Sequence, residues 1–239
     1  MRIATKIIKR EMIADNTLAC HILKPEGFEF KAGQYIDLTL IEPPVTDQEG
    51  NTRTYSIASA PYEDDLIIAT RLRDTAFKRV LRTDSFHNVE IDGPMGSFTL
   101  HINASRPAVF IAGGIGITPF RSIAMDASRR RLPHEIILFS SNRRPEDAAF
   151  LEEAAALEKE NPKYKFVGTM SGMGKSRRSW TGETGHINMD MLKRHIDINR
   201  QPVFYVAGPP QLVTAMRAML NSGGIIDDDM RTEEFAGYS

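Results

Sequence analysis

A glycine-rich turn directly after an apolar run is the feature that most constrains the fold of this chain. Residues 108–111 are apolar and predict a buried strand, and Gly113, Gly114 and Gly116 follow at once. Residues beyond Pro119 have helical spacing, so the glycines predict a strand-to-helix turn. Such a turn lets the backbone approach a ligand closely, and the first helical amides favour an anion, commonly a phosphate. The alternative is a tight turn that only lets the helix pack on the strand.

The turn does not have the spacing of the usual dinucleotide fingerprint. Its glycines read G-G-x-G, not G-x-G-x-x-G, and the next predicted strand, 135–139, runs into Ser140-Ser141-Asn142-Arg143 without an acidic residue. A dinucleotide fold that uses an acid to bind the ribose is therefore disfavoured.

Composition excludes several classes of partner. The chain has 239 residues, 41% of them apolar, and a formal net charge of −1. This length suits one large domain or two ordinary ones, and the charge gives no general attraction to nucleic acid or to anionic membrane. No apolar run is long enough to span a bilayer, and the N-terminus lacks the apolar region of a signal peptide. We therefore expect a cytoplasmic protein with neither nucleic acid nor membrane as a partner.

The single cysteine, Cys20, excludes an internal disulfide and a cysteine-rich zinc site. It also excludes an iron–sulfur cluster held by this chain alone, because such a cluster needs four ligands. The histidines show no metal-ligand spacing, so we expect no metal site.

The pattern of predicted elements changes near residues 103–107. Before this point we expect short strands with one helical segment at 75–81, a pattern typical of an antiparallel barrel or sandwich. After it, strands alternate with helices, which favours a parallel sheet covered by helices on both faces. The first set of strands is expected at 3–8, 17–23, 34–40, 53–57, 66–72 and 88–92. The second set is expected at 108–112, 135–140, 164–169 and 202–207, with helices at 118–131, 146–160, 188–195 and 209–222.

Ligands of such parallel sheets bind at the carboxyl ends of the strands. The glycine turn, residues 140–143 and residues 207–210 all follow predicted strands. We therefore expect these three loops to line one crevice that binds a phosphate or nucleotide.

Two motifs stand out in the first half. In the segment Arg53-Thr54-Tyr55-Ser56-Ile57, alternation places Arg53 and Tyr55 on one face, where an arginine can bind a phosphate and a tyrosine can stack on a flat ring. The alternative is a plain edge strand. The amides of the second motif, the turn at 93–98 (Gly-Pro-Met-Gly-Ser-Phe), suit an anion, although many such turns bind nothing.

In this order, the motifs resemble the ferredoxin–NADP reductase family of flavoenzymes over nearly the whole chain. Those that carry the resemblance are Arg-x-Tyr-Ser at 53–56, Gly-Pro-x-Gly-x-Phe at 93–98, Gly-Gly-Ile-Gly-Ile-Thr-Pro at 113–119, Asn-Arg at 142–143, Trp-x-Gly at 180–182 and Gly-Pro-Pro at 208–210. The resemblance implies an FAD-binding antiparallel β-barrel, 1–103, followed by an NAD(P)-binding α/β domain with a parallel sheet, 106–239.

The resemblance also implies roles for individual residues. Arg53 would hold the flavin pyrophosphate, Tyr55 would flank the flavin ring, and Ser56 would hydrogen-bond flavin N5 as the catalytic residue. Other residues of the flavin site would be Ala76, Phe77, Lys78, Gly96, Ser97, Phe235 and Tyr238, the last two as candidates to cover the ring. Residues of the NAD(P)H site would be Gly113, Gly114, Gly116, Ile117, Thr118, Pro119, Arg143, Gly208 and Pro209.

The implied function is an FAD-dependent NAD(P)H oxidoreductase that passes electrons to a separate acceptor. This acceptor would be ferredoxin, flavodoxin, an oxygenase component or free flavin. The alternative is a non-catalytic flavin-binding or regulatory subunit of a larger complex. The residues leave the choice between NADH and NADPH open, because Arg143 near the expected 2′-phosphate position does not decide it.

Two departures qualify the resemblance, and two further features, a P-loop-like segment and a basic cluster, have their own interpretations. Ala207 stands where the family often has cysteine near the nicotinamide. Plant-type members place an acid two residues before a terminal aromatic; counted from Tyr238 that position is Ala236, and Glu233 or Glu234 are possible substitutes. Gly174-Lys175-Ser176 resembles the end of a P-loop but lacks the earlier glycine and a following helix. The basic residues Lys175, Arg177 and Arg178 suit a solvated loop, with contact to a 2′-phosphate or a redox partner as the alternative.

Overall fold

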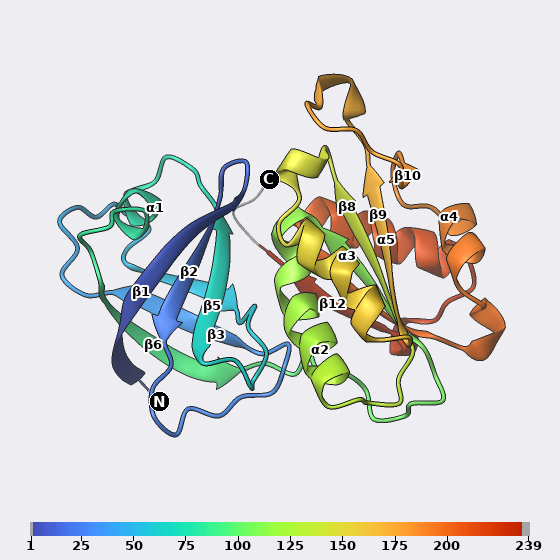
Figure 1. The fold of residues 1–239 in the computed structure, drawn as a ribbon, viewed down its shortest axis with the longest axis horizontal. Helices are drawn as coiled ribbons and strands as arrows, with labels where there is room; N and C mark the ends of the chain where they lie inside the picture. Colours follow the sequence, from blue (N-terminus) through green and yellow to red (C-terminus); the bar gives the residue numbers. More distant parts are fainter. Residues whose placement is uncertain (1, 236–239) are drawn as a thin grey trace.

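A computed structural model describes residues 2–235, and these form two sheets that lie side by side (Figure 1). The first is a curled, six-stranded antiparallel sheet with the order β4-β3-β6-β1-β2-β5. Its strands are β1 (Arg2–Ala14), β2 (Thr17–Leu23), β3 (Tyr35–Leu40), β4 (Thr52–Ser56), β5 (Asp65–Arg71) and β6 (Asn88–Met95). The short helix α1 (Ala76–Leu81) lies between β5 and β6 in the chain. The predicted antiparallel barrel is confirmed.

Alternation along the strands builds the interior of this barrel. In β3 the side chains of Ile36, Leu38 and Leu40 are buried, while the residues between them are partly exposed. Phe77 and Leu81 of α1 pack into the same apolar cluster. Each such buried side chain contributes about 1.5–3 kcal/mol relative to an exposed one.

Strand β1 is much longer than the predicted 3–8. Its pairing with β2 shifts register between Ile7 and Lys9 and again between Met12 and Ala14. Each irregularity changes which face a side chain occupies, so the regular alternation that identifies a strand is lost after Ile8.

The second sheet is also six-stranded, and every adjacent pair is parallel, with the order β10-β9-β8-β7-β11-β12. Its strands are β7 (Ala108–Gly113), β8 (Ile136–Asn142), β9 (Tyr164–Met170), β10 (Glu183–Thr184), β11 (Val203–Gly208) and β12 (Met230–Glu234). Its helices are α2 (Ile117–Arg129), α3 (Leu151–Glu160), α4 (Met189–His195) and α5 (Pro210–Ser222). The predicted parallel sheet is confirmed.

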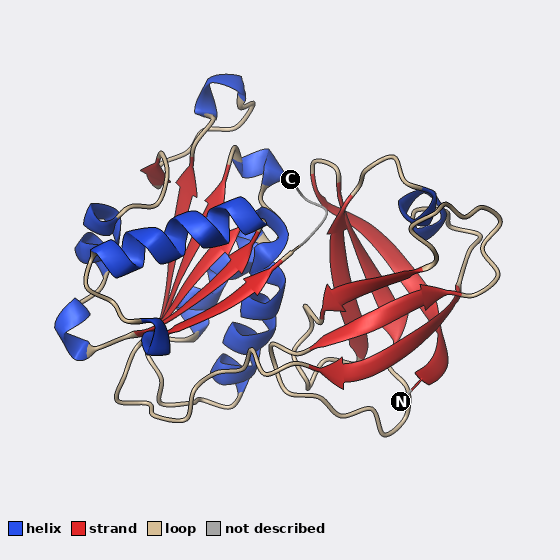
Figure 2. Ribbon diagram, turned by 180° about the vertical axis from the view of Figure 1, so that it is seen from behind, coloured by secondary structure: helices blue, strands red, loops and turns tan. Residues whose placement is uncertain are grey.

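Helices cover both faces of this sheet, as the two opposite views in Figures 1 and 2 show. Phe110 of β7 packs with α2 and stacks on Phe120, at 4.7 Å between ring centroids. The adjacent residues Val109 and Ile111 pack on the other face with α4 and α5. Burial on both faces explains why β7 is an unbroken apolar run.

Three local predictions for this domain were wrong or incomplete. The expected helix 146–160 is split, because Phe150 has a φ of 56° between a short 3-10 turn, η2 (Pro145–Asp147), and α3. The edge strands β10 and β12 were not expected at all. Both are short, and β12 is rich in charged residues, so neither has the apolar pattern of a buried strand.

The two sheets are joined by the segment between Met95 and Ala108, which contains the predicted domain boundary. Contacts also tie the domains together: Arg121 of α2 pairs with Glu63 at 2.8 Å, and the Ser122 hydroxyl donates to the Ser59 carbonyl at 2.6 Å. Among residues 2–235, none of the helices has the length and apolar character that crossing a membrane requires.

Candidate functional site

Strand β4 presents its predicted site residues on two sides. Arg53 and Tyr55 share one side, since both lie against Phe77 of α1. The Arg53 guanidinium carbon is 5.0 Å from the centroid of the Phe77 ring, and the centroids of the Tyr55 and Phe77 rings are 6.4 Å apart. Tyr55 is buried in the barrel cluster. Ser56 is also buried, but it is directed towards the second domain, where it hydrogen-bonds Glu233. The expected alternation of faces is confirmed.

Acidic residues of the loop between β3 and β4 contact the predicted pyrophosphate-binding groups. Arg53 donates to the Glu49 carboxylate at 2.6 Å and to the carbonyls of Glu49 and Thr52 at 2.9 and 2.8 Å. The amide of Ala76 donates to the Asp47 carboxylate at 2.9 Å. These groups are therefore arranged to bind anionic oxygens, and in this structure carboxylates supply them.

Lys78 adds a further positive charge to this region. Its ammonium group donates to the Arg71 carbonyl at 2.7 Å. Burial, together with the nearby charges of Arg73 and Arg53, lowers the pKa of Lys78 to about 8. Bringing an anion to this position would stabilise the charged form and raise that pKa again.

The turn that contains Gly96 and Ser97 lies closer to Ser56 than to Arg53. Tyr35 of β3 pairs with Ser56 on one side and with Met95 on the other, which places Gly96 at the Ser56 end of β4. Gly96 has a φ of 94°, and a Cβ atom there would lie 2.9 Å from the Tyr35 ring, so only glycine suits the position. The role of this turn in binding pyrophosphate stays a prediction.

Glu233 lies at the candidate site. From the sequence it was only one of two possible substitutes, with Glu234, for the acid that some family members have near the C-terminus. It lies on β12, where pairing with β11 aligns it with Ala207. Burial raises the pKa of Glu233 to about 7, although its hydrogen bond with Ser56 acts in the opposite direction. Its Oε2 atom is buried and has no hydrogen-bond partner among the residues that the structure describes. At a pH near 7, the Glu233 carboxyl group would therefore be protonated in about half of the molecules.

The spacing that the family resemblance uses, an acid two residues before an aromatic, also fits Glu233 when it is counted from Phe235 and not from Tyr238. Glu233 stands two residues before Phe235, whose amide donates to the Gly208 carbonyl at 2.9 Å. Phe235 packs against an apolar cluster that contains residues of both domains. Tyr238 and Ala236, the residues used for the count, lie outside the described residues.

The glycine turn has the predicted strand-to-helix geometry. Strand β7 ends at Gly113, a short 3-10 turn covers Gly114–Gly116, and α2 begins at Ile117. Gly114 has a φ of 53°. A Cβ atom on Gly116 would lie 2.1 Å from the Ala207 carbonyl oxygen, so glycine lets this turn pack directly on the end of β11. Close packing thus explains Gly116, and phosphate binding by this turn stays a prediction.

The three loops expected to converge do line one cleft, of about 940 Å³. It is bordered by Gly113–Ile115, by Ser141–Arg144 and by Pro209, together with His186, Lys175 and the barrel residues Arg71 and Arg73. The side chain of Thr118 is directed elsewhere: it is buried and donates to the Ile115 carbonyl at 3.1 Å. The exposed side chains of Arg143 and Lys175 border the cleft at the ends of β8 and β9. Excess positive charge along this wall suits a phosphate-bearing ligand.

The basic loop at 175–178 is not uniformly solvated. Arg177 pairs with Asp15 of the barrel at 2.9 Å, and Arg178 pairs with Glu152 of α3. Lys175 alone of these three lines the cleft. No helix follows the Gly-Lys-Ser segment, because residues 176–182 continue as a loop, so a P-loop is absent from this part of the described chain.

Comparison with known proteins gives the context of this arrangement. Residues 110–218 match the model of the family described as "Oxidoreductase NAD-binding domain". This segment begins in β7 and ends within α5, so it contains all three loops of the cleft.

Relatives among characterised proteins include reductase components of oxygenases. The chain is 25% identical to reductase component 2 of terephthalate 1,2-dioxygenase from Comamonas sp. over 241 residues, covering 98% of the chain and 68% of the relative. It is 29% identical to the reductase component of phenol 2-monooxygenase from Pseudomonas sp. (strain CF600) over 224 residues, covering 90% of the chain and 60% of the relative. The chain thus spans about two thirds of the length of these relatives.

Solved structures share the fold of the whole chain. The cytochrome P450 reductase of Amycolatopsis matches with a TM-score of 0.82 and 24% identity, covering 98% of this chain and 70% of that one. The ferredoxin NADP⁺ reductase of Neisseria gonorrhoeae, solved with bound FAD and NADP, matches with a TM-score of 0.78 and 21% identity, and the match covers 98% of both chains.

Proposed function

We propose that this chain is a member of the ferredoxin–NADP reductase-like flavoprotein oxidoreductases, an FAD-dependent NAD(P)H oxidoreductase that supplies electrons to a separate acceptor. Among acceptors, we propose an oxygenase component, because the reported relatives are reductase components of oxygenases. The sequence has one cysteine, too few for a cluster of four thiolates, so a one-electron acceptor lies outside these 239 residues.

One observation carries this proposal: a continuous contact joins the predicted flavin residue to the nucleotide cleft. Ser56 hydrogen-bonds Glu233, Glu233 is aligned with Ala207, and the Ala207 carbonyl lies against Gly116 of the glycine turn. A reaction between two cofactors needs their reacting atoms within near-attack distance. Residues assigned to the two cofactors by independent motifs are therefore neighbours across the domain boundary.

The residues present fit a flavin at this position. The buried Oε2 atom of Glu233 lacks a protein partner among the described residues, and Arg53 and the Ala76 amide already bind carboxylate oxygens. Arg53, Ala76 and Lys78 would hold the phosphates, and Tyr55 and Ser56 would border the ring. FAD, when bound, supplies a ring that accepts a hydride and releases electrons singly.

The chain itself supplies orientation and a proton-holding group. The Ser56 hydroxyl both donates and accepts hydrogen bonds, so it can serve a ring nitrogen in either protonation state. Glu233, whose pKa burial raises to about 7, can hold a proton next to this hydroxyl or release it at neutral pH. The second domain, which contributes Glu233, also closes this position from water, since Ser56 is buried.

Anaerobic stopped-flow reduction of the FAD-loaded chain by NADH and by NADPH tests the proposal. We expect the flavin absorbance to bleach with at least one nucleotide. A chain that binds FAD but is bleached by neither would instead be the non-catalytic flavin-binding subunit. A chain that binds no flavin would reject both functions. Reoxidation by a purified oxygenase component, compared with free flavin, then identifies the class of acceptor.

A further inference from the structure

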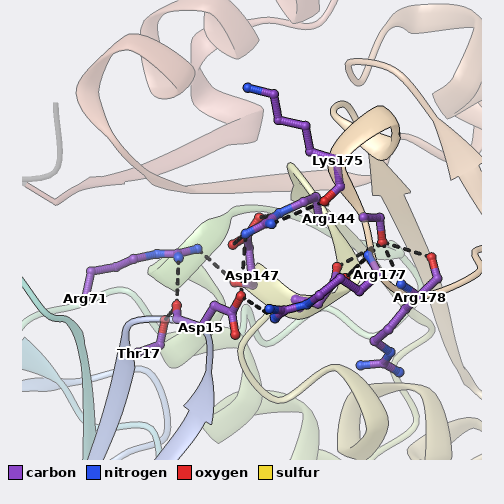
Figure 3. A network of polar contacts seen from close by, with 10 residues as sticks. Asp15, Thr17, Arg71, Arg144, Asp147, Lys175, Arg177 and Arg178 are labelled. Atoms are coloured by element: carbon purple, nitrogen blue, oxygen red, sulfur yellow. Dashed lines mark hydrogen bonds and ion pairs between the residues drawn. The ribbon is translucent and has the colours of Figure 1, made fainter.

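Two groups of polar contacts fasten the domains to each other. In the first group, the hairpin between β1 and β2 meets the loops of the second domain, and Asp15 pairs with Arg177 at 2.9 Å (Figure 3). Arg71 of β5 donates to the Asp147 carbonyl there, at 2.8 Å. In the second group, the segment that joins β6 to β7 meets β12. This second group lies on the strand that carries Glu233.

Arg231 of β12 contacts the joining segment. Its Nη1 atom donates to the Thr99 carbonyl at 2.7 Å, and its guanidinium carbon lies 5.2 Å from the centroid of the Tyr205 ring. A cation over a tyrosine ring is attracted by the ring electrons, so two contacts hold the side chain. Pairing of β12 with β11 aligns Arg231 with Tyr205, so the backbone register supports the same position.

Tyr205 gives Arg231 a rigid support. Its side chain is fully buried and packs edge to face with Phe110, at 5.2 Å between ring centroids. Its hydroxyl accepts from the His101 amide at 2.8 Å and donates to the Thr99 carbonyl at 3.3 Å, the oxygen that also accepts from Arg231. The joining segment, β11 and β12 are therefore fixed to one another at this point.

The joining segment begins beside the predicted flavin residue Ser56. Met95, at the end of β6, pairs with Tyr35, and Tyr35 pairs with Ser56 on its other side. Thr99 follows this turn in the chain. Through Thr99, Arg231 thus ties β12 to backbone that runs directly from the Ser56 end of the barrel.

Arg231 and Glu233 share one face of β12. Side chains alternate along a strand, and here both residues are partly buried while the residues on either side of Glu233 are exposed. The two positions lie about 7 Å apart along the strand. The contact of Arg231 with Thr99 therefore fixes how close this face lies to the barrel, and with it the approach of Glu233 to Ser56.

A second arginine fastens the segment directly before β12. Arg106 of the joining segment pairs with Asp229 at 2.6 Å. Loss of Arg231 would thus release the face that carries Glu233 without detaching the strand, because the contact at Asp229 and the pairing with β11 remain.

We propose that Arg231 is a positioning residue for flavin reduction, which holds β12, through the Thr99 carbonyl, at the distance where the Glu233 carboxyl group meets Ser56. This inference rests on the proposed function. In this role Arg231 acts through Glu233 and needs no contact with the reacting atoms. Without Arg231, water would reach the Glu233 carboxyl group.

Stopped-flow reduction of the FAD-loaded chain compares Arg231→Met and Arg231→Lys with Arg217→Met as a matched control. Arg217 is an exposed arginine of α5 that pairs with Asp227 at 3.4 Å. Methionine keeps an apolar contact with Tyr205 but cannot donate to Thr99. We expect Arg231→Met to lower the limiting rate ~10-fold, with the nucleotide concentration at half-maximal rate changed less than twofold, since a misplaced group slows the reaction and not the binding. Arg231→Lys keeps a donor and should recover part of the rate.

The pH dependence separates positioning from a general loss of stability. Ser56 hydrogen-bonds the Glu233 carboxyl group, Ala207 is aligned with it on β11, and Arg231 is the charged residue beside it on the same face. Burial raises the pKa of Glu233, so exposure to water should move the inflection of the limiting rate ~1 pH unit lower in Arg231→Met. Loss of the arginine charge alone would only raise this pKa, so a downward shift reports exposure.

Urea unfolding of the flavin-free chain gives a readout that is independent of activity. The free energy of unfolding that is lost between pH 4.5 and 7 should be smaller in Arg231→Met, because this loss grows with the height of the Glu233 pKa above 4.5. His101 also titrates near Arg231: burial lowers its pKa, and the Arg231 charge adds to this effect. Repeating both assays in a Glu233→Gln background separates the two groups, since an effect through Glu233 disappears there and one through His101 remains.

Several results would overturn the inference. An inflection in Arg231→Met that is unchanged or moves upward would reject it, as would an equal fall in rate in the Glu233→Gln background. A wild-type chain that is reduced normally, with the same rate and pH profile in Arg231→Met, rejects this inference alone. A wild-type chain that neither nucleotide reduces rejects the proposed function and this role with it.

Discussion

The two predicted phosphate sites differ in whether carboxylates of the chain already accept hydrogen bonds from the phosphate-binding groups. In the barrel, Glu49 accepts from Arg53 and Asp47 accepts from the Ala76 amide. In the nucleotide cleft, Arg144 donates to the Asp147 carboxylate, and both residues line the cleft. The glycine turn lines the same cleft. At the sites proposed here, a flavin phosphate would displace carboxylates of this chain, whereas a nucleotide phosphate would enter a cleft that is already formed. Preformed donors give affinity without the cost of reorganisation.

The largest expected effect concerns the point where the two sites meet. Ser56→Ala leaves both phosphate sites intact but removes the hydroxyl beside Glu233. We expect FAD retention with ~100-fold slower anaerobic flavin reduction, in line with the usual weight of a positioned proton-transfer group. Stopped-flow measurement with saturating nucleotide checks this, and unchanged kinetics would reject the assigned role of Ser56.

Arg53→Ala tests the barrel site alone. Loss of a charge-assisted phosphate contact should weaken FAD binding ~50-fold, while ADP-ribose binding to the second domain stays within twofold. Fluorescence titration with FAD measures the first and calorimetry the second. Wild-type flavin content in this variant would show that the pyrophosphate binds elsewhere.

Glu233→Gln tests, through the pH dependence of stability and of flavin reduction, whether the Glu233 carboxyl group holds a proton beside Ser56. The folded chain raises the pKa of this carboxyl from 4.5 to about 7, so the native state binds a proton that the unfolded state releases between these values. The free energy of unfolding contributed by this group is thus present below pH 4.5 and is lost as pH rises to 7. We expect Glu233→Gln, relative to wild type, to gain about 3 kcal/mol between pH 4.5 and 8, since one pKa unit corresponds to about 1.4 kcal/mol.

Urea unfolding of the flavin-free chain at several pH values measures that gain. In the FAD-loaded chain, the pH profile of flavin reduction should lose its inflection near neutrality in the same variant. A Glu233→Gln profile that matches wild type in both assays would contradict proton transfer through this residue.

The smallest expected effect has the opposite sign. Glu49→Gln removes the anion that competes for Arg53, so FAD should bind about fivefold more tightly, the size of one exposed charge pair. Lumiflavin, which has no phosphate, should bind equally well to both proteins. Weaker FAD binding in Glu49→Gln would show that this carboxylate assists the flavin and does not compete with it.

Much of the fold was predictable because its signals are local. The apolar run and the glycines around Gly113 identified β7 and the start of α2, and β2 was predicted with its observed limits. Strand β1 was only half predicted, since register shifts at Lys9 and Ala14 interrupt its alternation. The helix predicted from 146 begins at Leu151, because Phe150 has a positive φ, which the type of this residue does not predict.

The residues of the candidate site likewise fall into those that a local motif predicts and those that only the fold brings together. Arg53, Ser56 and the glycine turn belong to compact motifs, whose chemistry depends on neighbours in the sequence. Glu233 and Arg71 depend on neighbours in space: one meets Ser56 from the opposite end of the chain, and the other leaves the barrel to reach Gly114. The spacing to Phe235 made Glu233 a candidate, but it did not show that the side chain meets Ser56, and no local pattern marks Arg71.

The sequence by itself determined two domains, their order and the strand-to-helix turn at Gly113, because periodicity and backbone freedom are properties of short segments. Only the tertiary structure decided that β12 pairs with β11 and brings Glu233 to Ser56. It also decided that Arg71 crosses the domain boundary. The physical reason is register: a strand's partners fix where each side chain lies, and a shift by one residue would turn Glu233 to the other face.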